Sequence, residues 1–202
     1  MIDRPPVSYG HVSGSLPYPW PYDGDLSTDR FALLVVQQDV FEARPSHLDS
    51  LRSLASSVSA VGVLVVALVH GDGPVRVHGD VTVRAPGRDA FYATALDDVL
   101  RRHGRDHLAL AGSRLEVEVH STLRSANDRG YECLTLIDAC QPADPTLVYA
   151  ASSMIQMSGG IFGAVGTSQA LLAALHAARP HAARPHGARS TGTAPSLHEE
   201  HT

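Results

Sequence analysis

Residues 108–140 read LALAGSRLEVEVHSTLRSANDRGYECLTLIDAC, two short apolar runs on either side of an amphipathic segment. The runs Leu108–Leu110 and Cys133–Ile137 are typical of β-strands that are buried on both faces. Between them, Ser113 and Glu116 have the S-x-x-E spacing of a capping box, which predicts a helix from Ser113 to about Asn127. A strand, a helix and a second strand in this order predict two parallel strands joined by a crossover helix.

The same alternation continues in both directions from this unit. Further strands are predicted at Phe31–Val36, Val61–Val69 and Gly160–Val165. Further helices are predicted at Pro45–Ser57, Ala90–His103, Thr146–Met157 and Ser168–Ala178. The segment Gly71–Val83 contains glycine and alternating valines, which predicts a hairpin-like excursion. The chain therefore predicts a three-layer α/β/α fold, in which a mostly parallel sheet lies between two layers of helices.

Two flanking segments differ in composition from this α/β domain, which we expect to span residues 30–178. Residues 1–29 are rich in proline and aromatic residues, so we expect an extended arm over the surface, anchored by Trp20 and its neighbouring tyrosines. Residues 179–202 are rich in His, Ala, Arg and Pro and contain almost no large apolar side chains. We expect this tail to be disordered.

The composition excludes several classes of protein. The chain has 16 basic and 21 acidic residues and a formal net charge of −5, which argues against nucleic acid as a partner. A secretory signal pattern is missing and Val61–Val69 is too short to cross a bilayer, so we expect a soluble cytoplasmic protein with no membrane partner. Cys133 and Cys140 have the spacing of neither a zinc site nor a disulfide framework, and we expect no metal and no cofactor.

Ligands of open parallel sheets bind outside the carboxyl ends of the strands, which directs attention to Gln37–Asp39, Val69–Gly71 and Ala111–Glu118. Glu118 falls in the second turn of the predicted helix, between two valines. The field of a helix N-terminus favours a charged carboxylate, whereas burial favours the neutral acid, so both protonation states remain open. The alternative to a functional role is a surface position, paired with Arg114.

Three segments carry a resemblance to a known family: Val119–Thr122, Ala126–Cys133 and Asp138–Cys140. Shorter matches are Tyr18–Asp25, Pro86–Gly87, Ala90–Thr94 and Gly159–Val165. Over residues 17–177 the chain resembles the isochorismatase-like cysteine hydrolases, and within them the branch of biuret hydrolases and ureidoacrylate amidohydrolases. The resemblance implies a six-stranded, mostly parallel sheet, a homo-oligomer, and a triad of aspartate, lysine and cysteine whose thiolate attacks an amide or urea carbonyl.

This chain departs from the family at all three catalytic positions. Gln37 stands where the family's V-I-D-x-Q segment has its aspartate, Ala85 where a lysine precedes Pro-Gly, and Glu118 where the cysteine precedes His-Ser-Thr by two residues. The sequence contains no lysine, so all 16 basic residues are arginine and no other lysine can take over that role. The family's thiol hydrolysis therefore cannot operate here.

Two interpretations follow from the lost triad. In the first, the site is repurposed, and Glu118 and Gln37 catalyse a proton-transfer reaction, a dehydration or cyclisation, with Glu118 as general acid/base. The expected substrate is a small cationic guanidine-like or urea-like molecule, because the loss of lysine should make the site attract cations. The candidate substrate-binding residues are Asp39, Phe91, Tyr92, Trp20 and His120.

In the second interpretation, the protein is a non-catalytic relative that serves as a structural or regulatory subunit. We favour the repurposed enzyme for two reasons. A single base change does not convert a cysteine codon into a glutamate codon, and the neighbouring motifs Ala90–Tyr92 and Ser121–Thr122 are retained.

Overall fold

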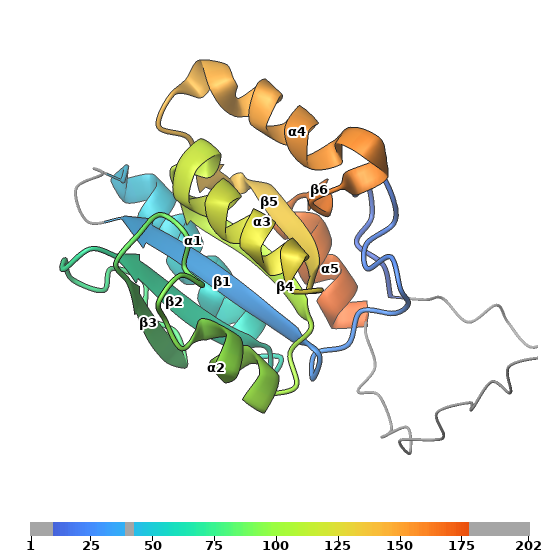
Figure 1. The fold of residues 1–202 in the computed structure, drawn as a ribbon. Helices are drawn as coiled ribbons and strands as arrows, with labels where there is room; N and C mark the ends of the chain where they lie inside the picture. The colour runs from blue at the N-terminus through green and yellow to red at the C-terminus, as the bar shows by residue number, and fades with distance from the viewer. Residues whose placement is uncertain (1–9, 39–42, 178–202) are drawn as a thin grey trace, which may run out of the picture.

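A six-stranded, all-parallel sheet with the strand order β3-β2-β1-β4-β5-β6 forms the centre of the molecule (Figure 1). The computed structural model describes residues 10–38 and 43–177. The strands are β1 (Phe31–Gln38), β2 (Leu64–His70), β3 (Val81–Ala85), β4 (His107–Ser113), β5 (Glu132–Gln141) and β6 (Ala164–Gly166). The α-helices are α1 (Pro45–Ser59), α2 (Leu96–Arg102), α3 (His120–Asp128), α4 (Val148–Gly160) and α5 (Ser168–Ala177). The predicted fold class is confirmed.

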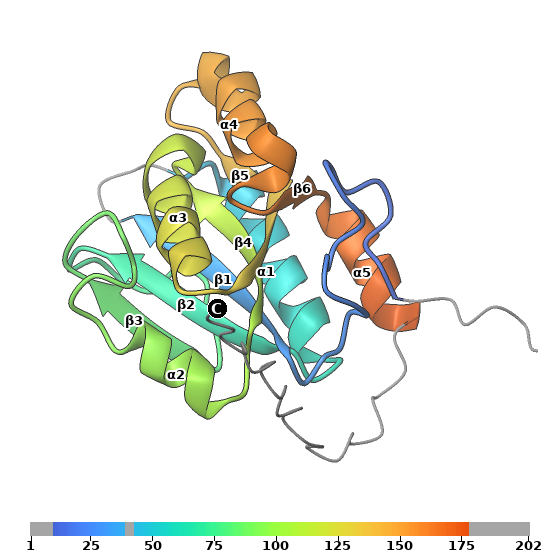
Figure 2. The ribbon, with the colours of Figure 1, turned by 45° about the vertical axis from the view of Figure 1, so that its right-hand side comes forward.

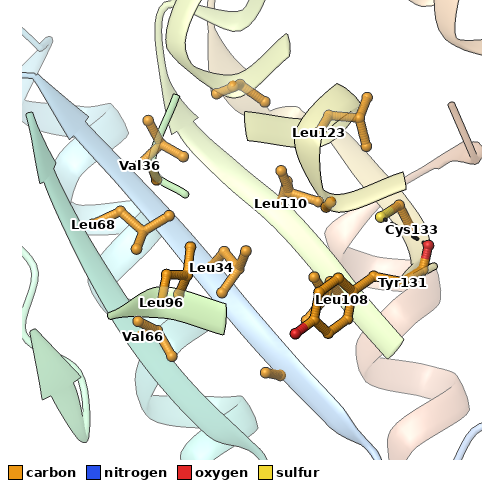
Figure 3. Packing of buried hydrophobic residues seen from close by; sticks show 14 of the residues in the cluster. Leu34, Val36, Val66, Leu68, Leu96, Leu108, Leu110, Leu123, Tyr131 and Cys133 are labelled. Atoms are coloured by element: carbon orange, nitrogen blue, oxygen red, sulfur yellow. Dashed lines mark hydrogen bonds between the residues drawn. The ribbon is translucent and has the colours of Figure 1, made fainter. Parts of the chain in front are cut away.

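Helices cover both faces of the sheet, and β1 shows why the strands are apolar throughout. Leu33 and Val35 point into a core that α1 and α5 cover. Leu34 and Val36 point the opposite way, into a core that α2, α3 and α4 cover (Figures 2 and 3). Because successive side chains of a strand face opposite sides, a strand between two helical layers must be apolar at every position.

The predicted capping box at Ser113 is wrong. Ser113 is the last residue of β4 and pairs with Gln141 of β5. Arg114 then adopts a left-handed backbone conformation with φ of 58°. A single turn of π-helix, η1 (Leu115–Val119), follows, and α3 begins only at His120. Pairing with a neighbouring strand extends β4 past the predicted cap, so the tertiary structure overrides the local preference.

Three other predicted elements differ from the structure. The hairpin-like excursion at Gly71–Val83 is absent from the described chain, because β3 pairs in parallel with β2 after an irregular loop. The helix predicted at Ala90–His103 is shortened to α2, since residues 90–95 form turns with Ala93 at φ of 53°. The strand predicted at Gly160–Val165 is reduced to β6, because α4 ends irregularly, with Ser158, Gly159 and Gly160 at positive φ, and a turn follows before Ala164.

The described part of the N-terminal arm lies beside β6 and α5 (Figure 1). Trp20 anchors this arm, as predicted: its side chain is fully buried and packs edge-on against Phe31 and His107. Leu16 forms an antiparallel bridge with Val165 of β6. The predicted tail, residues 179–202, lies outside the described residues. No helix in the described ranges is long and apolar enough to span a membrane.

Candidate active site

Glu118 is a completely buried carboxylate in η1, just beyond the carboxyl end of β4. Its Oε1 accepts a hydrogen bond from Nη1 of Arg88. Its Oε2 lies 3.3 Å from Nε of Arg114, outside hydrogen-bond geometry. Two guanidinium groups therefore compensate the carboxylate, as a buried charge requires. The alternative of a surface glutamate is excluded, although the predicted pairing with Arg114 is present.

The wide π-turn places Glu118 in this position. The N–H of Val119 donates to the carbonyl oxygen of Arg114, five residues earlier, at 3.4 Å. Leu115 and Val119 of the same turn pack into the core shared with α2 and α3, which fixes η1 against the sheet. Isolated π-turns are rare and occur frequently at functional sites.

Arg88 is the residue that sequence reasoning missed. It follows β3 by three residues and lies between the matched segments Pro86–Gly87 and Ala90–Thr94. Ala85, the position at which the resemblance implies a lysine, is the last residue of β3. Arg88 places a positive charge three residues after it. The signal that could have pointed to Arg88 is its position between two of the segments that carry the resemblance.

The two arginines change the electrostatics expected of the site. Loss of the family lysine was predicted to leave an acidic site that attracts cations. The described residues do not support this expectation, because Arg88 and Arg114 both face Glu118. One carboxylate between two guanidinium groups leaves a local excess of positive charge. The Arg88 side chain is 57% exposed, so it is the partner that solvent reaches.

Gln37 supports a loop, and no hydrogen bond joins it to Glu118 among the described residues. Its Oε1 accepts hydrogen bonds from the backbone N–H groups of Arg76 and Val77, both at 2.8 Å. Its Nε2 donates to the carbonyl oxygen of Val77 at 2.8 Å. Gln37 shares a sheet face with Val35, the face that α1 and α5 cover. The structure thus places the Gln37 and Glu118 side chains on opposite faces of the sheet.

Gln38, rather than Gln37, is on the Glu118 face. Strand register aligns Gln38 with His70 of β2, and His70 with Ala85 of β3. His70 is 2% exposed, and its Nδ1 lies 2.7 Å from the carbonyl oxygen of Gly87, the residue before Arg88. Gln38, His70 and Ala85 therefore lie side by side on three adjacent strands. His70 contacts Gly87, which immediately precedes the Arg88 that contacts Glu118.

Glu118 forms its ion pairs with Arg88 and Arg114, and none of the other predicted residues that the structure describes is a hydrogen-bond or ion-pair partner of Glu118. Phe91 is buried beside Tyr131 and beneath the Arg129 guanidinium, while the Tyr92 side chain is exposed. His120 is buried edge-on against Phe162, and burial together with the nearby Arg124 lowers its pKa. Trp20 lies at the opposite, amino end of the strands. Asp39 lies outside the described residues.

Neither cysteine replaces the lost nucleophile. Cys133 and Cys140 are both buried, and burial raises the pKa of each thiol, that of Cys140 to about 12. A thiol with such a pKa carries almost no thiolate at neutral pH. Within the described ranges, no group of three or more His, Cys, Asp or Glu side chains is arranged to hold a metal ion.

The model of the isochorismatase domain matches residues 47–170, more than half of the chain. The chain belongs to the isochorismatase family. Among solved structures, it resembles a cysteine hydrolase from Pseudomonas syringae pv. phaseolicola, with a TM-score of 0.66 and 20% identity over 75% of this chain and 95% of that one. It also resembles an N-carbamoylsarcosine amidase from Thermoplasma acidophilum, with a TM-score of 0.56 and 22% identity over 69% and 96% of the two chains. At these identities the similarity shows the fold alone.

Similarity in sequence extends to ureidoacrylate amidohydrolases. The enzyme of Acinetobacter baylyi is 37% identical over 73 residues, which cover 36% of this chain and 30% of that protein. The enzyme of Klebsiella pneumoniae subsp. pneumoniae is 33% identical over 102 residues, which cover 50% of this chain and 42% of that protein. The chain therefore spans less than half of the length of these relatives.

Proposed function

We propose that this protein is an enzyme that catalyses a dehydration or cyclisation of a small amide-containing or urea-containing substrate, with Glu118 as general acid/base. The observation that carries the proposal is a fully buried carboxylate at the family's nucleophile position, held on a π-turn between two arginines. A carboxylate transfers protons but is a poor substitute for a thiolate nucleophile. Proton transfer is therefore the chemistry that this side chain supports.

The similarity to ureidoacrylate amidohydrolases supports an amide or urea group as the part of the substrate that binds. Arg88 and Arg114 argue against the cationic guanidine considered from the sequence, because a third positive charge would be repelled. A neutral or anionic molecule fits better. The exposed Arg88 side chain can turn from Glu118 toward a substrate oxygen, which would free Oε1 for proton transfer.

The experiment uses the purified full chain and a panel of ureas, carbamoyl amino acids and primary amides, analysed by mass spectrometry. We expect at least one compound to lose water. Glu118→Gln should lower that rate by about 10²–10⁴-fold, the usual contribution of a general acid/base. The matched control is Glu116→Gln, which removes the same charge from the same turn. A rate that Glu118→Gln leaves unchanged would contradict the proposal.

A non-catalytic role is the second candidate, and Gln37 is the observation that favours it. Its amide is fully engaged by the backbone of Arg76 and Val77, as in a structural support. If no compound of the panel changes mass while the protein still binds members of it, the chain is a binding protein rather than an enzyme.

A further inference from the structure

Two side chains at the same carboxyl edge of the sheet as Glu118 have buried polar atoms that the proposed chemistry does not use. Gln38 at the end of β1 and His70 at the end of β2 are direct neighbours in the parallel register. Both are on the face that α2 and α3 cover, as is η1 with Glu118. The connection to Glu118 runs through the backbone: Gly87 contacts His70, and the next residue, Arg88, contacts Glu118.

The hydrogen bond of His70 determines what its other nitrogen can do. A carbonyl oxygen only accepts, so the Nδ1 that lies 2.7 Å from the Gly87 oxygen must carry the proton and donate. In the neutral ring, Nε2 is then an acceptor. This Nε2 is buried and has no hydrogen-bond partner among residues 10–38 and 43–177.

Gln38 carries a second buried acceptor without a partner. Its Oε1 has no hydrogen-bond partner in the part of the chain that the structure describes. Oε2 of Glu118 also makes no hydrogen bond there, but it lies in an ion pair with Arg114 at 3.3 Å. A buried acceptor without a partner costs about 1–3 kcal/mol, and native proteins keep few of them. Two neighbouring unpaired acceptors at the carboxyl edge of the sheet, Gln38 Oε1 and His70 Nε2, indicate a ligand that supplies N–H donors.

We propose that His70 Nε2 and Gln38 Oε1 accept hydrogen bonds from the –NH₂ group of a neutral urea or primary carboxamide, and that His70 determines this specificity. The inference rests on the proposed function, because it assigns the residues that bind the substrate for which Glu118 is the proposed general acid/base. A fully N-alkylated urea such as tetramethylurea has the same carbonyl but no donor, so it leaves both acceptors unpaired. A guanidinium has the donors but is repelled by Arg88 and Arg114.

The test measures binding alone, by titrating the full chain with N-methylurea, tetramethylurea and methylguanidinium while following the imidazole ¹⁵N resonances. We expect N-methylurea to shift the His70 Nε2 resonance, methylguanidinium to bind at least about fivefold more weakly, and tetramethylurea not to bind. Equal affinity for N-methylurea and tetramethylurea would overturn the proposal.

Variants assign the effect to the two side chains. His70→Phe keeps a ring and removes the acceptor, and it should weaken N-methylurea binding at least about tenfold. Gln38→Leu removes the neighbouring acceptor and should weaken it severalfold, which provides a second test if His70→Phe does not fold. The matched control is His103→Phe at the exposed end of α2, which should bind as the wild type does. Unchanged binding in both His70→Phe and Gln38→Leu would refute the assignment.

These outcomes separate the two proposals. If N-methylurea binds through His70 but no urea or amide is turned over, the recognition site stands and the enzymatic proposal fails. If a substrate is turned over with the expected dependence on Glu118 but His70→Phe binds it normally, the enzymatic proposal stands and the recognition site fails.

Discussion

Each end of the sheet contains a buried histidine, but the two rings differ in how many of their nitrogens have hydrogen-bond partners. His107, at the amino end of β4, is 1% exposed and has carboxylates on both nitrogens, with Asp106 on Nδ1 and Asp23 on Nε2, each at 2.7 Å. Arg30 bridges the same two carboxylates. His70, at the carboxyl end of β2, is equally buried, yet only its Nδ1 has a partner in the described ranges.

The difference indicates which end is structural and which is functional. A polar network in which every member is paired fixes one geometry, and here it attaches Asp23 of the N-terminal arm to the start of β4. A buried ring with one free acceptor contributes less to stability but remains available to a ligand. We therefore expect changes at the amino end to alter stability, and changes at His70 to alter ligand binding.

The largest expected effect on stability comes from the buried ion pairs of Glu118. They lie at the carboxyl end of the sheet, so they are an exception to the expectation that stability depends on the amino end. Glu118→Ala leaves the largely buried Arg114 without its counter-charge and should lower the free energy of unfolding by about 3–5 kcal/mol, measured by urea denaturation. The control is Asp49→Ala, which breaks an exposed pair with Arg52 and should cost less than about 1 kcal/mol. Equal effects of the two variants would mean that burial does not strengthen the Glu118 pairs.

The histidines themselves provide the direct comparison. His107→Asn removes a buried hydrogen bond from Asp106 or Asp23, which then keeps only its bonds with Arg30, and should cost about 1–3 kcal/mol in the free energy of unfolding. His70→Asn loses a single hydrogen bond and should cost about 1 kcal/mol or less. Denaturation curves of the two variants, recorded side by side, decide the point. A larger loss for His70→Asn would reverse the assignment of the two ends.

The same cluster predicts a dependence of stability on pH. Burial opposes the charged form of His107, but hydrogen bonds to Asp106 and Asp23 outweigh it and raise the pKa of His107 above 6.5. Its contribution is complete below pH 6.5 and disappears as the pH rises through the raised pKa. Burial also opposes the charged form of Asp106, but hydrogen bonds from His107 and Arg30 lower its pKa to about 2. That contribution is present above pH 3.8 and lost as the pH falls toward 2.

Unfolding free energies measured from pH 2 to pH 9 should therefore show the contribution of this cluster to be greatest between about pH 4 and pH 6.5. His107→Asn should abolish the decline attributed to the cluster on the alkaline side. If the variant keeps that decline, another group is responsible for it.

The smallest expected effect concerns a buried acceptor away from both ends. Thr135 in β5 is fully buried, and its hydroxyl has no partner within the described residues. Thr135→Val replaces that hydroxyl with a methyl group and should stabilise the protein by up to about 1 kcal/mol without changing ligand binding. Thermal unfolding and N-methylurea titration measure the two effects. Weakened binding would show that buried acceptors beyond Gln38 and His70 take part in recognition.

The sequence was sufficient to predict the layers of the fold, because burial on both sides leaves a simple signature. Phe31–Val36 is apolar at every position, as a central strand between helical layers must be. The start of the helix after β4 could not be predicted from the same kind of pattern. Ser113 and Glu116 have the spacing of a capping box, but pairing with β5 keeps Ser113 in the strand.

Part of the candidate site can be located from the sequence. Glu118 is conspicuous because it follows an apolar strand, and the structure shows its side chain to be completely buried. Arg88 could not be placed in the same way, because its contact with Glu118 depends on β2 and β3 pairing in parallel, where the sequence favoured a hairpin. His70 and Gln38 end their strands as expected, but which hydrogen bonds they make depends on where Gly87 lies in space.

The backbone bridge between Leu16 of the N-terminal arm and Val165 of β6 predicts how removal of the arm affects aggregation. The N–H of Leu16 donates to the carbonyl oxygen of Val165 at 2.9 Å, and the N–H of Val165 donates to that of Leu16 at 2.8 Å. An outermost strand that lacks such a cover offers its backbone to other chains as a template for polymerisation. Proteolysis that removes the first 16 residues should therefore expose the backbone of β6 and increase the tendency of the protein to precipitate as fibres or amorphous aggregates.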